Sequence, residues 1–176
     1  MTAFTASKDF HLLECVSFHQ KKDSKSSIFH SGDIKGRGKG DDQTINVNLY
    51  NIDPEVMYIG FYVNVETNHK NFSNVWNSYC RIFDPNSKTE YFKYNLNNKE
   101  EACFIAYMIR DINNNTWKLK PLGKLVEALT TRCLVMEIEL NITEGRSYYN
   151  QFEEEISGMN LKSNNKENVG CECRLF

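Results

Sequence analysis

The residues best able to do chemistry lie in a glycine- and aspartate-rich segment over positions 32–42. Four of the nine glycines fall there, and three carboxylates accompany them, at Asp33, Asp41 and Asp42. Glycine adopts positive φ without a steric penalty, so such a segment can wrap tightly. Hard cations such as Ca²⁺ take about six to eight oxygen ligands from carboxylates and exposed carbonyls. Taken alone, the segment is interpreted as a flexible polar connection whose aspartates make hydrogen bonds, with a calcium site as the alternative.

Other chemistries of glycine-rich loops do not fit this spacing. An EF-hand needs alternating Asp or Asn positions and a terminal Glu, which are missing. A P-loop needs Ser or Thr after its lysine, but Lys39 is followed by Gly40, and a dinucleotide fingerprint would place its third glycine at Asp41. The loop also carries three basic side chains, those of Lys35, Arg37 and Lys39. They would either repel a cation or neutralise the aspartates.

A second motif lies at the end of the sequence. Cys173-Arg-Leu-Phe has the C-a-a-X form, and the terminal Phe176 is typical of geranylgeranyl transfer. Cys171 could accept a palmitoyl group, and two lipids anchor a protein stably where one binds only marginally. The motif predicts a lipid tether to a membrane in a eukaryotic cell. The alternatives are an incidental cysteine or a zinc-binding pair, although Cys-x-Cys supplies only two of the usual four ligands.

Composition argues against several classes of protein. The 176 residues include 21 Lys and Arg against 23 Asp and Glu, a net charge of −2, which gives no general attraction to nucleic acid. No run of about 18 apolar residues predicts a membrane span, and no secretory signal is visible, so a cytoplasmic location is expected. Because no Ser-His-Asp, paired-carboxylate or metal-hydrolase pattern is present, we predict that the protein is not an enzyme. An enzyme that uses a Cys or a His is the alternative.

Short apolar segments separated by turns predict an all-β fold, an antiparallel β-sandwich with one or two short helices. The expected strands cover residues 45–49, 57–65, 75–83, 89–96, 103–109 and 117–122. A helical piece is expected over 124–131, and 134–140 is interpreted as a strand, with helix as the alternative. The first eight residues are expected to lack regular structure. From about residue 157 the Asn-, Lys- and Glu-rich composition predicts a flexible C-terminal tail.

Individual side chains also have expected roles. His30 is interpreted as capping the loop that follows it, with metal ligand or base as the alternative. Arg81 and Arg110 are expected to make structural ion pairs. Four further cysteines in strand-like segments are interpreted as small core residues, namely Cys15, Cys80, Cys103 and Cys133.

Several spaced motifs accompany the glycine segment in a fixed order. They are His30-Ser-Gly-Asp33, Gly36-x-Gly38-x-Gly40-Asp41-Asp42, Pro54-Glu-Val56 through Val65, Phe72-x-x-Val75-x-Asn77-x-x-x-Arg81, Glu90-x-x-x-Tyr94-x-Leu96, and Arg110 with Trp117-Lys-Leu-Lys-Pro-Leu-Gly123. Together they resemble the signature of the TerD-type tellurium-resistance and stress-response family. The resemblance holds from about Val16 to Gly123.

The resemblance implies a β-sandwich that binds Ca²⁺ through Asp33, Asp41 and Asp42. The sequence departs from the family pattern because the N-terminal strand pair and its acidic motif are absent. In addition, Lys39 and Gln43 stand where acidic residues are expected. Calcium affinity depends on the number of carboxylates, so we expect weak binding or none.

These observations predict three parts: an N-terminal segment over 1–15, a TerD-like β-sandwich domain over 16–140, and a C-terminal extension and flexible tail over 141–176. The expected function is a non-enzymatic stress-response binding or scaffold module, linked to calcium, tethered by lipids and recognising an unknown protein partner. The alternative is a degenerate family member whose basic loop binds an anion or a protein without calcium.

Overall fold

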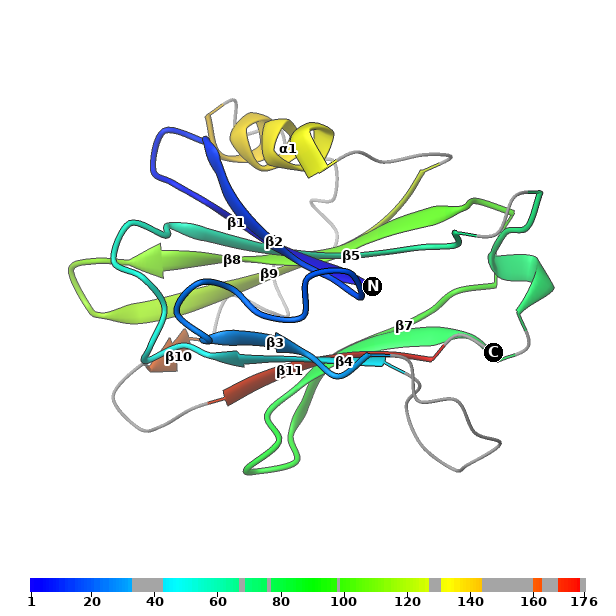
Figure 1. Ribbon diagram of the computed structural model, residues 1–176, viewed down its shortest axis with the longest axis horizontal. Coiled ribbons are helices and arrows are strands. Elements are labelled where there is room, and N and C mark those ends of the chain that lie inside the picture. The colour runs from blue at the N-terminus through cyan, green and yellow to red at the C-terminus, as the bar shows by residue number, and fades with distance from the viewer. Residues whose placement is uncertain are drawn as a thin grey trace.

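The computed structural model describes residues 1–32, 43–66, 69–75, 77–97, 99–126, 131–143, 160–162 and 168–174. Within these ranges the strands form two sheets that face each other (Figure 1). The first has the order β10-β9-β8-β5-β1-β2, with β1 (Thr2–Ala6), β2 (Leu12–Val16), β5 (Tyr58–Asn64), β8 (Ala102–Asp111), β9 (Thr116–Val126) and β10 (Asn160–Lys162).

The second sheet has the order β3-β4-β11-β6-β7. Its strands are β3 (Ile28–His30), β4 (Gln43–Asn48), β6 (Tyr79–Phe83), β7 (Glu90–Asn95) and β11 (Asn168–Arg174). A 3-10 turn, η1 (Phe72–Asn74), lies between β5 and β6, and α1 (Thr131–Thr143) covers the outer face of the first sheet (Figure 1). Every strand pair in the described part of the chain is antiparallel, which confirms the expected all-β sandwich.

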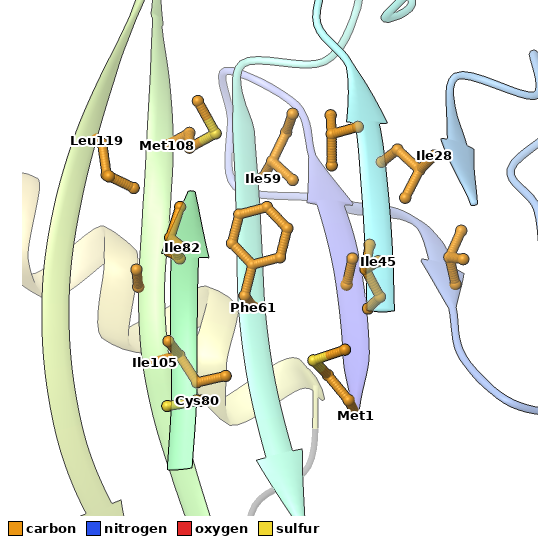
Figure 2. Close-up of a cluster of buried hydrophobic side chains, with 14 of the residues drawn as sticks. Met1, Ile28, Ile45, Ile59, Phe61, Cys80, Ile82, Ile105, Met108 and Leu119 are labelled. Carbon is orange, nitrogen blue, oxygen red and sulfur yellow. The ribbon is translucent and has the colours of Figure 1, made fainter. Parts of the chain in front are cut away.

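The core fills the space between the two sheets. Figure 2 shows side chains from both sheets meeting there, including Phe61 from β5 and Ile82 from β6, both fully buried. The six strands expected between residues 45 and 122 appear as β4 to β9. In β4, for example, Ile45 and Val47 are buried while their neighbours are half-exposed. Alternation of this kind is what a strand with one buried face requires.

The expectation that the first eight residues lack regular structure is wrong. β1 lies between β5 and β2, and all five of its residues are buried. Ala3 packs in the core between the sheets, whereas Phe4 packs on the opposite face, under α1. A strand buried on both faces shows no polar alternation, so its sequence carried no periodic signal. The expected boundary at residue 16 falls at the end of β2, inside the same sheet.

The expected helix over 124–131 and the expected strand over 134–140 are also corrected. Residues 124–126 continue β9, while 134–140 lie in α1; residues 127–130 are outside the described part. The buried residues of α1 are Leu134, Val135 and Ile138, at helical spacing. The apparent alternation was misleading because Met136 and Leu140 are exposed to solvent. None of the described helices is long and apolar enough to cross a membrane.

The C-terminal extension contributes two strands where a flexible tail was expected. β10 pairs with β9, and β11 lies between β4 and β6. Cys171 occupies the register position between Ile45 and Ile82, both of which are fully buried. Val169, Cys171 and Cys173 recur with the period of a strand. The prediction of a flexible tail rested on the average composition of the whole polar segment, and that average concealed the local strand pattern.

Candidate functional site

The glycine- and aspartate-rich loop connects β3 to β4. Asp33, Asp41 and Asp42, the candidate calcium ligands, lie outside the described residues. The stem below them is closed, because the Ser31 amide donates to the Thr44 carbonyl at 2.8 Å and the Thr44 amide donates to Ser31 Oγ at 2.9 Å. The two ends of the loop therefore start from adjacent positions at one end of the second sheet.

His30 orders the base of this loop. Its side chain is fully buried, and its Nδ1 accepts a hydrogen bond from the Gly32 amide at 2.8 Å. Gly32 has φ of +81°, a conformation that favours glycine. A Cβ at that position would also lie 2.9 Å from Lys21 Nζ. The contact with Gly32 agrees with the capping role expected of His30.

The surroundings of the stem are basic. Lys21 lies beside Gly32, with its ammonium 5.6 Å from the Phe18 ring, and Lys22 lies at the same distance from the Phe29 ring. Among the described side chains, no group of three or more His, Cys, Asp and Glu residues is placed to hold a metal ion.

A second polar centre, Arg110 on β8, fastens the turn after β4 to the first sheet. Its guanidinium donates to the carbonyls of Ile52 at 3.1 Å and Asp53 at 3.0 Å, and lies 4.7 Å from the Trp117 ring. The pKa of Arg110 is lowered, chiefly because burial disfavours its charged form, and the Asp53 carboxylate partly opposes that shift. The expected ion pair is thus replaced by carbonyl and ring contacts, whereas Arg81 does pair with Glu90 at 3.5 Å.

Replacement of Arg110 by methionine is expected to lower the free energy of unfolding by about 2–3 kcal/mol, because two carbonyls lose their donor and the Trp117 face loses its cation. Arg110→Lys should cost less than methionine, since it keeps a charge but not the planar fork. Urea unfolding measures both. Arg81→Met is the control: Arg81 also lies over a ring, that of Phe83 at 5.0 Å, but its partner Glu90 is a half-exposed carboxylate and not a pair of backbone carbonyls, so the loss should be under about 1 kcal/mol. Equal losses of unfolding free energy at Arg110 and Arg81 would contradict the structural role assigned to Arg110.

The comparison with known proteins decides the family. A family model described as the TerD domain matches residues 5–130. The chain belongs to the TerD family. The match begins within β1 and runs past β9, so it takes in the end of β1 and all of β2. The expectation that the resemblance starts only near Val16 was therefore too narrow.

Several curated proteins share this TerD region. The chain is 32% identical over 112 residues to tellurium resistance protein TerZ from Serratia marcescens, covering 63% of this chain and 57% of TerZ. It is 29% identical over 115 residues to general stress protein 16U from Bacillus subtilis, covering 61% and 58%. It is 30% identical over 118 residues to chemical-damaging agent resistance protein B from Clostridium acetobutylicum, covering 63% and 84%. The chain thus spans less than three-fifths of the first two relatives.

The cysteines of this TerD chain occupy different environments. Cys80 and Cys103 are buried, as expected of small core residues. Cys15 is half-buried, and burial raises the pKa of its thiol, whereas Cys133 is exposed, contrary to expectation. The lipidation candidates Cys171 and Cys173 both lie in β11, whose backbone pairs on both sides. Their lipidation stays a sequence prediction.

Proposed function

We propose that this TerD-family chain is a non-enzymatic stress-response binding module whose binding element is the loop between β3 and β4. The closed stem carries the proposal, because Ser31 and Thr44 bring the attachment points of the loop together on a well-packed sheet. Relatives named for tellurium resistance and general stress support the stress-response role. A loop presented in this way by a rigid scaffold is a common arrangement for binding sites.

The proposed ligand is a calcium ion held by Asp33, Asp41 and Asp42 together with loop carbonyls. In the sequence, Asp33 follows Gly32, the last described residue before the loop, and Asp42 precedes Gln43, the first described residue after it. The three carboxylates share the loop with three basic residues, which leaves it without net charge. Because affinity depends on ligand charge, we expect a dissociation constant of about 10⁻⁴–10⁻³ M.

Calorimetric titration of the full chain with Ca²⁺ tests the proposed site. Wild type should show saturable binding, and a variant with Asp41→Ala and Asp42→Ala should lose it. Asp111→Ala is the matched control, because that carboxylate is held by Lys118 at 3.2 Å at the turn between β8 and β9. If wild type shows no heat of binding, calcium is not the ligand. The same conclusion follows if the loop variant shows the same heat of binding as wild type.

One observation favours an anion as the alternative ligand. Lys21 Nζ lies beside Gly32 at the base of the loop, where it adds a fourth positive charge to Lys35, Arg37 and Lys39. Inorganic phosphate should then raise the melting temperature of wild type, and substitution of Lys35 and Lys39 by glutamine should remove the effect. A response to phosphate without a response to calcium would favour this alternative.

A membrane tether is not part of the proposal. The backbone of Cys173 is paired with β4 at Gln43 and with β6 at Cys80, and its lipidation stays a prediction from the sequence motif.

A further inference from the structure

One edge of the sandwich carries two exposed phenylalanines. β2 and β3 are edge strands of their sheets and contact each other, and the connection between them crosses from the first sheet to the second (Figure 1). Phe18 lies in that connection and Phe29 lies in β3, with 44% and 39% of their surfaces exposed. In the described part of the chain they are the only exposed phenylalanines. Apolar surface that folding leaves in water in this way often marks an interaction site.

Each of these rings is accompanied by an exposed lysine. Lys21 Nζ lies 5.6 Å from the centre of the Phe18 ring, and Lys22 Nζ lies 5.6 Å from the centre of the Phe29 ring. Lys22 and Phe29 are also bridge partners, and the Lys21 carbonyl accepts from the amide of His30, the residue after Phe29. These contacts bring the two phenylalanines and the two lysines to the same edge of the molecule. We call these four residues the aromatic–lysine edge.

The two lysines of this edge are not held in ion pairs. Among the described side chains, neither has a carboxylate within ion-pair distance. The nearest acidic residues in the described sequence bind the turn before β3 instead. Glu14 accepts from the amide and the hydroxyl of Ser24, and Asp23 accepts from the Ile28 amide at 2.7 Å. Two ammonium groups beside two exposed rings therefore remain available to an external anionic surface.

We propose that the aromatic–lysine edge docks this chain reversibly on an anionic lipid bilayer. Protein segments that bind at a bilayer interface combine apolar rings, which enter the boundary between headgroups and acyl chains, with lysines on their polar side. Long lysine stems lie along apolar surface while the ammonium reaches the lipid phosphates. A soluble anion would engage the two lysines but would leave both rings in water, so it accounts for only half of this surface.

The proposed contact goes beyond the binding module proposed above. It involves neither calcium nor the loop between β3 and β4, and it needs no lipid attached to a cysteine. Each lysine near an anionic surface strengthens binding about fivefold. With two lysines and two rings, the association constant should not exceed that of a single myristoyl chain, about 10⁴ M⁻¹.

Sedimentation of the full chain with lipid vesicles tests the proposal, in EDTA so that the outcome is independent of calcium. Wild type should bind vesicles that contain phosphatidylserine, should bind pure phosphatidylcholine vesicles far less, and should be released by salt. Lys21→Gln combined with Lys22→Gln should lower the association constant about 10- to 30-fold. Phe18→Ser combined with Phe29→Ser should lower it at least about tenfold, because the apolar surface that enters the interface is lost.

Two control variants match these changes elsewhere on the surface. Lys88→Gln with Lys99→Gln removes the same charge from exposed positions on either side of β7, the opposite edge strand of the second sheet. Tyr50→Ser with Ile112→Ser removes two exposed apolar side chains from the turns after β4 and β8. Both controls should bind vesicles as wild type does.

Four results would overturn the proposal. They are no binding of wild type to phosphatidylserine vesicles, equal losses in the control variants, binding to polyglutamate but not to vesicles, and self-association of wild type that the phenylalanine variant abolishes. The last two would assign the edge to an acidic polypeptide or to a second copy. If a variant fails to fold, hydrogen exchange of wild type still decides, because vesicles should slow exchange over residues 17–30 and unchanged exchange there would contradict docking.

Discussion

Removal of residues 168–176 is expected to abolish the cooperative unfolding transition of this TerD-family chain. The deletion takes away β11, so β4 and β6 lose their shared neighbour and the second sheet divides into β3-β4 and β6-β7. Backbone groups on two strands would lose their partners. The fully buried Ile45 and Ile82 would lose the strand between them. Isolated two-stranded ribbons are marginally stable in water.

Thermal unfolding followed by circular dichroism measures this effect. The matched control deletes only residues 175–176, which leaves all of β11 in place and should preserve the transition. A cooperative transition in the longer deletion, within a few degrees of wild type, would show that β11 is dispensable.

Replacement of Gly60 by valine is expected to be among the most destabilising single substitutions in the chain, at about 3 kcal/mol or more. Gly60 on β5 is the register partner of Phe4 on β1, and any Cβ there would overlap the Phe4 ring. The ring is fully buried, with the rings of Tyr62 and Phe104 centred 6.3 and 6.0 Å away. Close packing on this side leaves the ring little room to move.

A double-mutant cycle in urea unfolding tests the cause of that loss. Gly60→Ala should be strongly destabilising in wild type, but it should cost under about 1 kcal/mol in a Phe4→Ala background, where the ring is absent. Phe4→Ala by itself should cost about 3–5 kcal/mol through the cavity that it leaves. Additive losses in the double variant would show that Gly60 is constrained by something other than the Phe4 ring.

The strands with one buried face could be predicted from the sequence, because each carries its own periodic signal. β4 shows this most clearly, with Ile45 and Val47 buried at alternate positions. The turn at Asp84 was predictable for a similar local reason, since its carboxylate accepts from the Asn86 amide at 2.8 Å and from Ser87 Oγ at 2.7 Å. Aspartate favours such turns through these short-range bonds.

The candidate site could be predicted only in part. The residue types of the loop and the capping role of His30 follow from the local sequence, because that histidine bonds an amide two residues away. The contacts of Arg110 do not follow, since its acceptors are the carbonyls of Ile52 and Asp53, far away in the chain. Every residue carries a carbonyl, so no residue type indicates which carbonyl a distant side chain will meet.

Local sequence patterns were enough to predict the all-β class, the central strands, the aspartate-bearing loop and the resemblance to the TerD family. The folded chain was needed to show that β1 lies inside the first sheet, that β11 joins β4 to β6, and that Cys173 is the register partner of Cys80. These features escape local patterns because strand pairing is non-local. A strand's own residues indicate which faces are buried, but its neighbours and its register depend on segments that folding brings together from the whole chain.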